Sequence, residues 1–323
     1  MNKIEKLVLS TTKAKSLHKV EVIQGLWSGY GEIVRYALTD SQIKNVVVKQ
    51  VQLSSSGNHP RGWGTGLSHL RKVKSYEVEM AWYKLYSHRC DDYCRVPHCF
   101  EFEKVEGNVI LVLEDLDDAG YAGRKTAVGL FEMEMCLSWL ANFHATFMYE
   151  SPLELWDVGT YWHLATRTEE LEVLKDVSLK NIAQDIDDRL SESSFLTFVH
   201  GDAKLANFCF SDDDNSVAAV DFQYVGGGCG MKDVAYFIGS CLDSNQCSEN
   251  ENRLLNFYFR KLKNALQSKK MKIDTDKLEK DWRDLYPFAC ADFDRFLKGW
   301  SPKHSKINSY TERITQDIIN QLK

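Results

Sequence analysis

The sequence predicts an α+β protein with two lobes: a strand-rich N-terminal lobe built on an antiparallel sheet, and a mainly helical C-terminal lobe. The chain has 323 residues, which is long for one small core and suits two lobes. Short β-branched runs separated by turn residues dominate its beginning, whereas long helical patterns follow Asp118. We place the division in a short connection near 114–118, so that the lobes span residues 1–115 and 116–323.

The N-terminal lobe is expected to contain five strands and one helix. The strands are predicted at Val20–Gln24, Ile33–Leu38, Val46–Val51, Cys99–Val105 and Val109–Glu114, with the last two joined as a hairpin around residues 106–108. Helical periodicity covers Leu67–His88. Residues 52–66 are rich in Ser, Gly and Pro, which is typical of a loop, and the composition of residues 59–66 is compatible with a lid over a site.

A segment in the second half of the chain carries the strongest chemical signal. Asp202 and Asn207 stand five positions apart, and Asp221 follows at the end of a short apolar run. Phosphoryl transfer from a magnesium nucleotide requires this combination, because one carboxylate orients the acceptor hydroxyl while the amide and the second carboxylate hold the metal ions. The pattern predicts Asp202 as a catalytic residue and Asn207 with Asp221 as metal ligands. A helix-capping Asp and a loop Asn are the structural alternative.

The residues around this segment predict how the metal ligands meet. Phe195–Val199 is typical of a buried strand that leads into it. Leu205–Phe210 and Val217–Val220 indicate two strands joined by a turn. Such a hairpin places Asn207 and Asp221 at neighbouring ends, where both reach one ion.

A glycine-bearing loop between the first two strands is a candidate phosphate-binding element. Gly25, Gly29 and Gly31 allow backbone N–H groups to approach phosphate oxygens without a Cβ in the way. Ser28 and Tyr30 belong to the same loop and are included in the candidate nucleotide site. An ordinary hairpin loop uses the same residues, so the position of the loop ahead of a strand lysine is what favours a nucleotide.

That lysine is Lys49, a polar residue inside an apolar strand. A lysine that binds phosphate needs a carboxylate to fix its position, and Glu79 shares the helix face of Tyr76 and Tyr83. Glu77 is the alternative partner, because helix boundaries are uncertain. The competing interpretation of Lys49 is an edge-strand lysine that points at water.

The predicted connection between the lobes is a candidate site for the base of a nucleotide. The strand that ends at Glu114 leads directly into Leu116, at the point where the lobes would meet. Backbone groups of both residues are placed to pair with an adenine edge. This prediction follows from position and not from side-chain identity.

Together these features resemble the aminoglycoside phosphotransferase and choline kinase superfamily, which shares the protein-kinase fold. The run Val199–Asn207 and the triplet Asp221-Phe222-Gln223 look most similar to its ecdysteroid-kinase-like branch. Glycine loop, strand lysine, helix glutamate, hinge, catalytic loop and metal aspartate follow in the superfamily's order over nearly the whole chain. Leu140–His144 is similar to the helix ahead of its catalytic segment. The resemblance implies a protein-kinase-like fold for the two lobes.

The resemblance also implies residue roles. Lys204 is similar to a kinase lysine that contacts the transferred phosphate. The resemblance implies that Asp202 is the catalytic base and that Asn207 and Asp221 are the magnesium ligands. It also implies that Lys49 and Glu79 form the ion pair that positions the phosphates.

Two features depart from protein kinases. The glycine loop reads Gly-x-x-x-Gly-x-Gly, which is not their pattern. Gln223 stands where they have glycine, and this is similar to small-molecule kinases. The second departure argues against a mobile activation loop, so protein substrates are not expected.

Composition excludes several partner classes. The net charge of −6 argues against a general nucleic-acid binder, which needs a basic surface. No segment reaches the apolar length of a membrane span, and the N-terminus lacks the apolar core of a signal peptide. Nine cysteines, an odd number, indicate reduced thiols rather than a disulfide frame. We therefore expect a cytoplasmic protein with neither nucleic-acid nor membrane partners.

Other groups have competing interpretations. His144 is expected in the core, and His200 is expected to brace the catalytic loop. Asp233 is either a support for that loop or the cap of the next helix. The acids and aromatics of residues 282–300 either hold an amine substrate or pack into the core, which we favour. The Cys and His residues between 88 and 99 do not match the spacing of a structural zinc site.

The sequence therefore predicts an enzyme, an ATP-dependent small-molecule kinase that transfers the γ-phosphate of Mg-ATP to a hydroxyl. Amino alcohols, aminoglycosides, sugars and steroid-like alcohols all remain open as acceptors, and the sequence does not separate ATP from GTP or indicate the oligomeric state. One alternative is a nucleotidyl transferase on a kinase-like fold. Another is a nucleotide-sensing binding protein without turnover.

Overall fold

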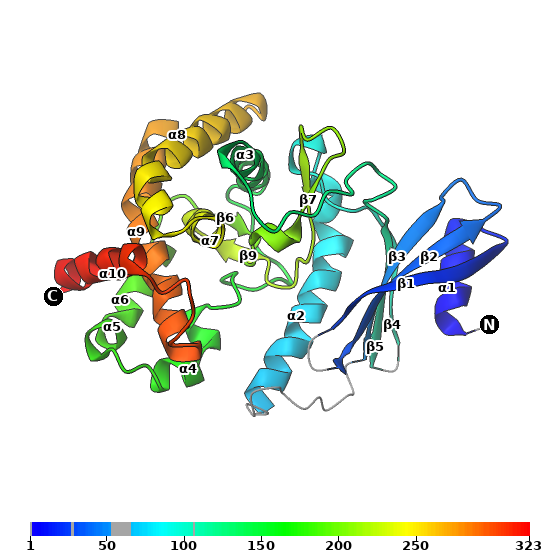
Figure 1. Ribbon diagram of the computed structural model, residues 1–323, viewed down its shortest axis with the longest axis horizontal. Coiled ribbons are helices and arrows are strands. Elements are labelled where there is room, and N and C mark those ends of the chain that lie inside the picture. Colours follow the sequence, from blue (N-terminus) through cyan, green and yellow to red (C-terminus); the bar gives the residue numbers. More distant parts are fainter. Residues whose placement is uncertain (1, 27–28, 53–65, 106) are drawn as a thin grey trace.

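The computed structural model describes residues 2–26, 29–52, 66–105 and 107–323. It has two lobes, with a five-stranded antiparallel sheet at one end and a mainly helical lobe at the other (Figure 1). The two termini lie toward opposite ends of the long axis, and helix α2 (Gly66–Leu85) runs between the sheet and the helical lobe (Figure 1). The predicted α+β fold with a sheet-based lobe and a helical lobe is thereby confirmed.

The sheet contains every strand predicted for the N-terminal lobe. Its order is β1-β2-β3-β5-β4, with β1 Ser16–Gly25, β2 Gly31–Thr39, β3 Asn45–Gln52, β4 Cys99–Val105 and β5 Asn108–Glu114. β3 is the central strand, and successive side chains of a strand point to opposite faces of the sheet. Val46 and Val48 therefore lie in a small apolar cluster on the face of the sheet away from the helical lobe. Lys49 and Val51 point to the other face, toward α2 and the helical lobe.

The outer face of the sheet is covered by a helix that the sequence analysis did not predict. α1 spans Lys3–Thr12 and begins with a capping box, in which Asn2 and Glu5 each accept a hydrogen bond from the other's backbone N–H. Val8 packs against Val34 and the valines of β3. The N-terminal lobe thus has two α-helices in its described part, and the prediction of one was wrong. The apolar stripe of α1 is short, so capping and contact with the sheet stabilise it.

α2 begins close to its predicted start but ends before its predicted end. The helix stops at Leu85, and two 3₁₀ turns, η2 (Ser87–Arg89) and η3 (Asp92–Cys94), lead to β4. The described residues of this region form no group of ligands that could hold a metal ion, and all nine cysteines of the chain are free thiols. Trp82 of α2 stacks on Phe222 with the ring centroids 4.5 Å apart, which joins the two lobes through an aromatic contact.

The C-terminal lobe is a bundle of helices whose aromatic side chains pack into the main core and into a second, smaller cluster around Trp162. Its helices are α3 Leu130–Thr146, α4 Thr168–Glu172, α5 Val177–Asn181, α6 Ala183–Ser191, α7 Met231–Cys241, α8 Ser244–Ser268, α9 Thr275–Trp300 and α10 Ser309–Leu322, with a 3₁₀ turn η4 at Leu164–Thr166. Among the described residues, no helix combines the length and the apolar character needed to cross a bilayer.

The predicted catalytic segment, residues 200–207, lies between two small sheets. They pair β6 (Thr197–Val199) with β9 (Gly226–Gly228), and β7 (Phe208–Phe210) with β8 (Val217–Ala219). The hairpin was predicted, but its first strand was drawn too long, because Leu205–Asn207 forms a 3₁₀ turn, η5. The Asn207 amide donates back to the carbonyl of Asp202 and closes this turn.

The strand β9 was not predicted, since a run of three glycines has low strand propensity. Close contact with the backbone at Trp156 explains the glycines. A Cβ on Gly226 would lie 2.2 Å from the carbonyl oxygen of Trp156, which leaves no room for any side chain.

Candidate active site

A cavity of about 1110 Å³ lies between the two lobes and is lined by residues from both. The sheet, α2, the connection after β5 and the catalytic segment all contribute to its walls. Most of the predicted site residues line this cavity together, namely Tyr30, Lys49, Glu79, Glu114, Leu116, Asp202, Lys204, Asn207 and Asp221. The fold therefore brings together residues that are far apart in the sequence.

Lys49 and Glu79 form a buried ion pair. The Lys49 ammonium lies 2.9 Å from Oε1 and 2.6 Å from Oε2 of Glu79, and both side chains are almost fully buried. Burial opposes the charge on Lys49, but the carboxylates of Glu79 and Asp221 raise its pKa above the ordinary value. Lys49 is on the central strand, so the interpretation as an edge lysine facing water is wrong.

The alternative partner, Glu77, points away from the cavity and pairs with Lys104 at 2.7 Å, with 42% of its side chain exposed. We expect Glu79→Gln to lower the free energy of unfolding by about 3 kcal/mol, because the buried ammonium loses its nearer carboxylate and keeps only Asp221 at 3.4 Å among the described residues. Glu77→Gln is the matched control and should change it by less than about 0.5 kcal/mol. Urea unfolding monitored by circular dichroism measures both. Equal effects of the two substitutions would contradict the assignment.

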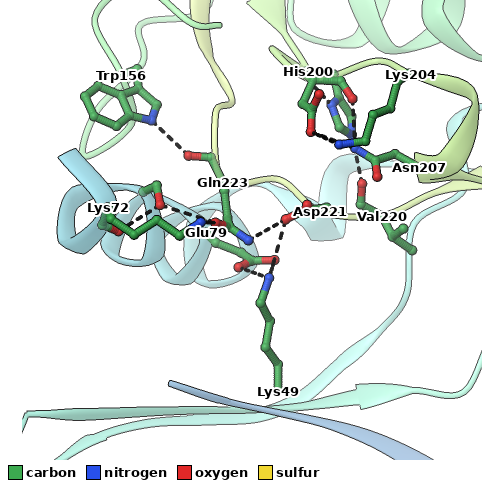
Figure 2. Close-up of polar contacts among 12 residues, drawn as sticks. Lys49, Lys72, Glu79, Trp156, His200, Lys204, Asn207, Val220, Asp221 and Gln223 are labelled. Atoms are coloured by element: carbon green, nitrogen blue, oxygen red, sulfur yellow. Dashed lines mark hydrogen bonds and ion pairs between the residues drawn. The ribbon is translucent and has the colours of Figure 1, made fainter. Parts of the chain in front are cut away.

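Asp221 is the point at which cations from both lobes converge. Figure 2 shows Lys49 and Gln223 pointing toward it, with Lys49 Nζ at 3.4 Å and Gln223 Nε2 at 2.6 Å from Oδ1. Lys72 of α2 in turn donates to Gln223 Oε1 at 2.8 Å. Burial alone would raise the pKa of Asp221, but the charges of Lys49, Lys72 and Lys204 lower it to about 2. The carboxylate is therefore ionised at neutral pH.

Asp202 is buried and has hydrogen-bond donors on both of its oxygens. Lys204 Nζ lies 2.8 Å and Asn207 Nδ2 3.2 Å from Oδ2, while the Tyr236 hydroxyl donates to Oδ1 at 3.1 Å. Burial is the main reason that the pKa of Asp202 is raised above its ordinary value, and the nearby charge of Lys204 opposes the shift. A carboxylate held in this way has a fixed orientation toward the cavity.

The backbone of the catalytic loop is held by a second carboxylate. Asp233 accepts hydrogen bonds from the backbone N–H groups of His200 and Gly201, at 2.5 and 2.9 Å. The cap of α7 is Gly230, so Asp233 supports the loop and does not cap the helix. The fully buried His144 contacts Asp233 at 3.2 Å, and the His200 ring bonds the carbonyl of Val220 at 3.0 Å (Figure 2). Both histidines brace the structure, as predicted.

The glycine loop is only partly placed by the structure. Tyr30 lines the cavity, whereas Gly25, Gly29 and Gly31 are not among its lining residues. Ser28 lies outside the described residues, and so does most of the segment 59–66 that was considered as a lid. Gly31 is required for a different reason, since its φ is +146° and a Cβ would lie 1.9 Å from the carbonyl oxygen of Gln50. The phosphate-binding role of the loop stays a prediction.

The connection after β5 is held by side chains that the sequence analysis did not select. Arg95 Nη2 donates hydrogen bonds to both carboxylate oxygens of Glu114, each at 2.6 Å. The Leu116 carbonyl accepts from Tyr121 N–H. Arg35 of β2 binds Asp115 at 2.6 Å and also contacts Asp117 and Glu21. We name these four residues, Arg35, Glu21, Asp115 and Asp117, the Arg35 clamp.

The aromatic residues of α9 divide between the core and the cavity. Trp282, Tyr286 and Phe288 are buried in the core, whereas Phe296 and Trp300 line the cavity. Asp292 is fully buried and bound by Arg295 at 2.8 Å, and Asp294 is bound by Lys298 at 2.8 Å. Neither carboxylate lines the cavity, so the hypothesis that α9 supplies acids to hold an amine is wrong.

The oxygen atoms at the predicted metal position suit a hard cation. Asn207 and Asp221 both line the cavity, and Val220 N–H donates to the Asn207 carbonyl at 3.0 Å, which keeps the two residues adjacent. The Asn207 side chain donates through its nitrogen to Asp202, so the amide oxygen is left for a ligand. Amide and carboxylate oxygens are the ligands that Mg²⁺ prefers, together with water and phosphate. The residues present therefore fit this ion.

Sequence reasoning missed Lys72 and Tyr236. A signal for Lys72 existed, because Lys72, Tyr76 and Glu79 recur at the spacing of one helix face. Tyr236 lies in α7, far from Asp202 in the sequence, and no local pattern distinguishes it from a core tyrosine.

Comparison with known proteins identifies the family. No curated protein matches the chain. Among solved structures, an ethanolamine kinase from Plasmodium vivax has a TM-score of 0.54 at 10% identity, over 96% of this chain and 85% of the other. An amicoumacin kinase in complex with AMP-PNP, Ca²⁺ and Ami has a TM-score of 0.51 at 12% identity, over 98% and 92%. At such identities the likeness shows the fold.

The family model of the ecdysteroid kinase-like family matches residues 68–154 and 157–272. These ranges make up well over half of the chain and include α2, the hinge after β5 and the whole catalytic segment. The protein therefore belongs to the ecdysteroid kinase-like family and is a phosphotransferase with an alcohol group as acceptor.

Proposed function

We propose that the protein transfers the γ-phosphate of Mg-ATP to a hydroxyl group of a small molecule. The observation that carries the proposal is the convergence of Asp202, Asn207, Asp221 and the Lys49–Glu79 pair on one cavity between the lobes. The amicoumacin kinase of the same fold, which was solved with AMP-PNP and Ca²⁺, supports a nucleotide with a divalent cation. We further propose that residues 1–115 bind the nucleotide, and that residues 116–323 supply catalysis and bind the acceptor.

The residues of the cavity supply positioning and charge for this reaction. Asp202 orients the acceptor hydroxyl, because its carboxylate is held by three donors. Burial raises the pKa of Asp202, which suits it to take up the proton of the hydroxyl. Lys49, Lys72 and Lys204 place positive charge beside the phosphates. Asn207 and Asp221 would hold Mg²⁺, which when bound neutralises charge on the β- and γ-phosphates. Catalysis of phosphoryl transfer consists mostly of positioning and electrostatics, and this site provides both.

The two alternatives predict different products. A nucleotidyl transferase would leave the nucleoside monophosphate on the acceptor, and a binding protein would leave the acceptor unchanged. The ion pair of Lys49 with Glu79 and the presence of a fixed Asp202 favour phosphoryl transfer, because a protein that only binds has no need of a base.

A screen of alcohols by ADP release tests the proposal. The purified protein is incubated with Mg-ATP and amino alcohols, aminoglycosides, sugars or hydroxylated steroids, and mass spectrometry of the modified acceptor identifies the added group. We expect ADP release above the acceptor-free rate with at least one alcohol, and an added mass of one phosphoryl group. An added nucleotidyl mass, or tight ATP binding with no ADP release across the screen, would overturn the proposal.

A further inference from the structure

Beyond Asp202, the cavity is lined by aromatic side chains of the helical lobe. They are Tyr161, Tyr224, Tyr236, Phe296 and Trp300. Hydrogen bonds connect this wall to the catalytic carboxylate, since Tyr236 donates to Asp202 and the Tyr161 hydroxyl lies 3.4 Å from that of Tyr236. The rings of Tyr161 and Tyr224 are 5.8 Å apart and meet edge to face. An acceptor that presents a hydroxyl to Asp202 therefore places its remaining atoms against flat apolar surfaces.

Two guanidinium groups lie at the end of this aromatic wall. Arg167 bonds the Tyr161 carbonyl and lies over the Phe296 ring, 5.2 Å from its centroid. Arg71 of α2 bonds the carbonyl of Thr166, the residue before Arg167. Both arginines line the cavity. We name Arg71 and Arg167 the arginine subsite.

The two arginines differ in how their charges are balanced. Arg167 is paired with the buried Glu170 at 3.1 Å. Arg71 forms no ion pair with any residue that the structure describes. Burial and the like charge of Arg167 lower the pKa of Arg71, although an arginine stays protonated in proteins. The charges of Glu169 and Glu170 partly offset this repulsion, but neither residue lines the cavity. The Arg71 guanidinium, which has no ion-pair partner among the described residues, thus faces the cavity.

Carboxylates are distributed unevenly around the cavity. Among its described lining residues, Glu21, Glu114, Asp115 and Asp117 belong to β1, to the end of β5 and to the connection after it. The others, Glu79, Asp202 and Asp221, are the residues assigned to phosphate positioning, catalysis and metal binding. No lining carboxylate is therefore left to balance an ammonium group at the arginine subsite.

We propose that the arginine subsite binds a carboxylate group of the acceptor, so that the substrate is a flat, largely apolar alcohol with an anionic substituent remote from the reacting hydroxyl. The inference rests on the proposed kinase function, because it assumes that the hydroxyl lies at Asp202. Guanidinium groups bind carboxylates through paired, charge-assisted hydrogen bonds. Cationic acceptors such as amino alcohols and aminoglycosides are disfavoured, since their charge would meet two arginines.

Three alcohols of one scaffold test the proposal: 4-(hydroxymethyl)benzoate, 4-(hydroxymethyl)benzamide and 4-(hydroxymethyl)benzylamine. Each is titrated by calorimetry into protein saturated with Mg²⁺ and AMP-PNP, so that the phosphate sites are filled. We expect the benzoate to bind about tenfold more tightly than the amide, and the amine to bind most weakly. Arg71→Gln should remove the advantage of the benzoate and leave the amide unchanged, while Arg71→Lys should keep part of the advantage. Arg253→Gln, on the exposed face of α8, is the control and should alter none of the three.

The outcomes separate the subsite from the kinase activity. Equal affinities for benzoate and amine, no binding of any of the three, or an equal loss for all three with Arg71→Gln would each overturn the subsite. Unchanged AMP-PNP affinity in the Arg71 variants shows that they are folded. ADP release is measured separately with Mg-ATP and the same alcohols. Binding of the benzoate in the expected order without ADP release by any alcohol would contradict the kinase function and support the subsite.

Discussion

Replacing Asp202 by Ala is expected to lower turnover roughly a hundredfold or more, while the affinity for the nucleotide stays nearly unchanged. The carboxylate is buried and is held by Lys204, Asn207 and Tyr236, and among the described lining residues no other carboxylate lies beside the aromatic wall to take its place. Turnover is measured as ADP release with the alcohol that the screen identifies. Nucleotide affinity is measured by displacement of a fluorescent ATP analogue.

Asp202→Asn separates the loss of the charge from the loss of the side chain. The amide keeps the size of the carboxylate and still accepts a hydrogen bond from Tyr236, but it cannot take up a proton. We expect it to be about as inactive as the Ala variant. An Asn or Ala variant that releases ADP at the wild-type rate would show that Asp202 is not the base.

Asp221→Asn is expected to reduce turnover by a factor of about 10² to 10³, the effect of removing one strong electrostatic group from an active site. The substitution suits the backbone, because Asp221 has φ +68° and Asn tolerates this left-handed conformation. It keeps an oxygen for Gln223 but removes the charge that attracts Lys49 and that would attract Mg²⁺. Steady-state ADP release is measured over a range of Mg²⁺ concentrations.

The Mg²⁺ dependence distinguishes a metal ligand from a purely structural residue. With Asp221→Asn, half-maximal activity should require a higher Mg²⁺ concentration, whereas a structural role would lower activity at every concentration alike. Asp212→Asn is the matched control, because Asp212 is exposed in the turn between β7 and β8. It should behave as the wild type. An unchanged Mg²⁺ requirement for Asp221→Asn would contradict its assignment as a ligand.

The sequence predicts those parts of the site that follow from local spacing. The separation of Asp202 and Asn207 by five positions, and the apolar strand around Lys49, are short-range patterns that place side chains directly. Glu79 was preferred over Glu77 from helical periodicity alone, and the structure places Glu79 on Lys49. The same helical periodicity places Lys72 on the face of Glu79. The prediction did not include Lys72, because the sequence does not indicate a partner for it.

Contacts between segments that are remote in the sequence could not be predicted from local patterns. The glycines of β9 have low strand propensity, and only the neighbouring Trp156 backbone shows why they form a strand. The acids of α9 suggested an amine site, but Arg295 and Lys298 neutralise them inside the helical lobe. Tyr236 reaches Asp202 from α7 only because the helices fold back onto the catalytic loop. Each case depends on a tertiary neighbour that the local sequence does not specify.

The Arg35 clamp fastens the glycine-loop side of the sheet to the connection between the lobes with one guanidinium and three acids. A movement of the sheet relative to the connection would strain these ion pairs. Its outer partner, Glu21, is half exposed, so dissolved ions weaken that attraction. We therefore expect the attachment of the sheet to the connection to weaken as ionic strength rises, so that measured rates would depend on the salt content of the buffer.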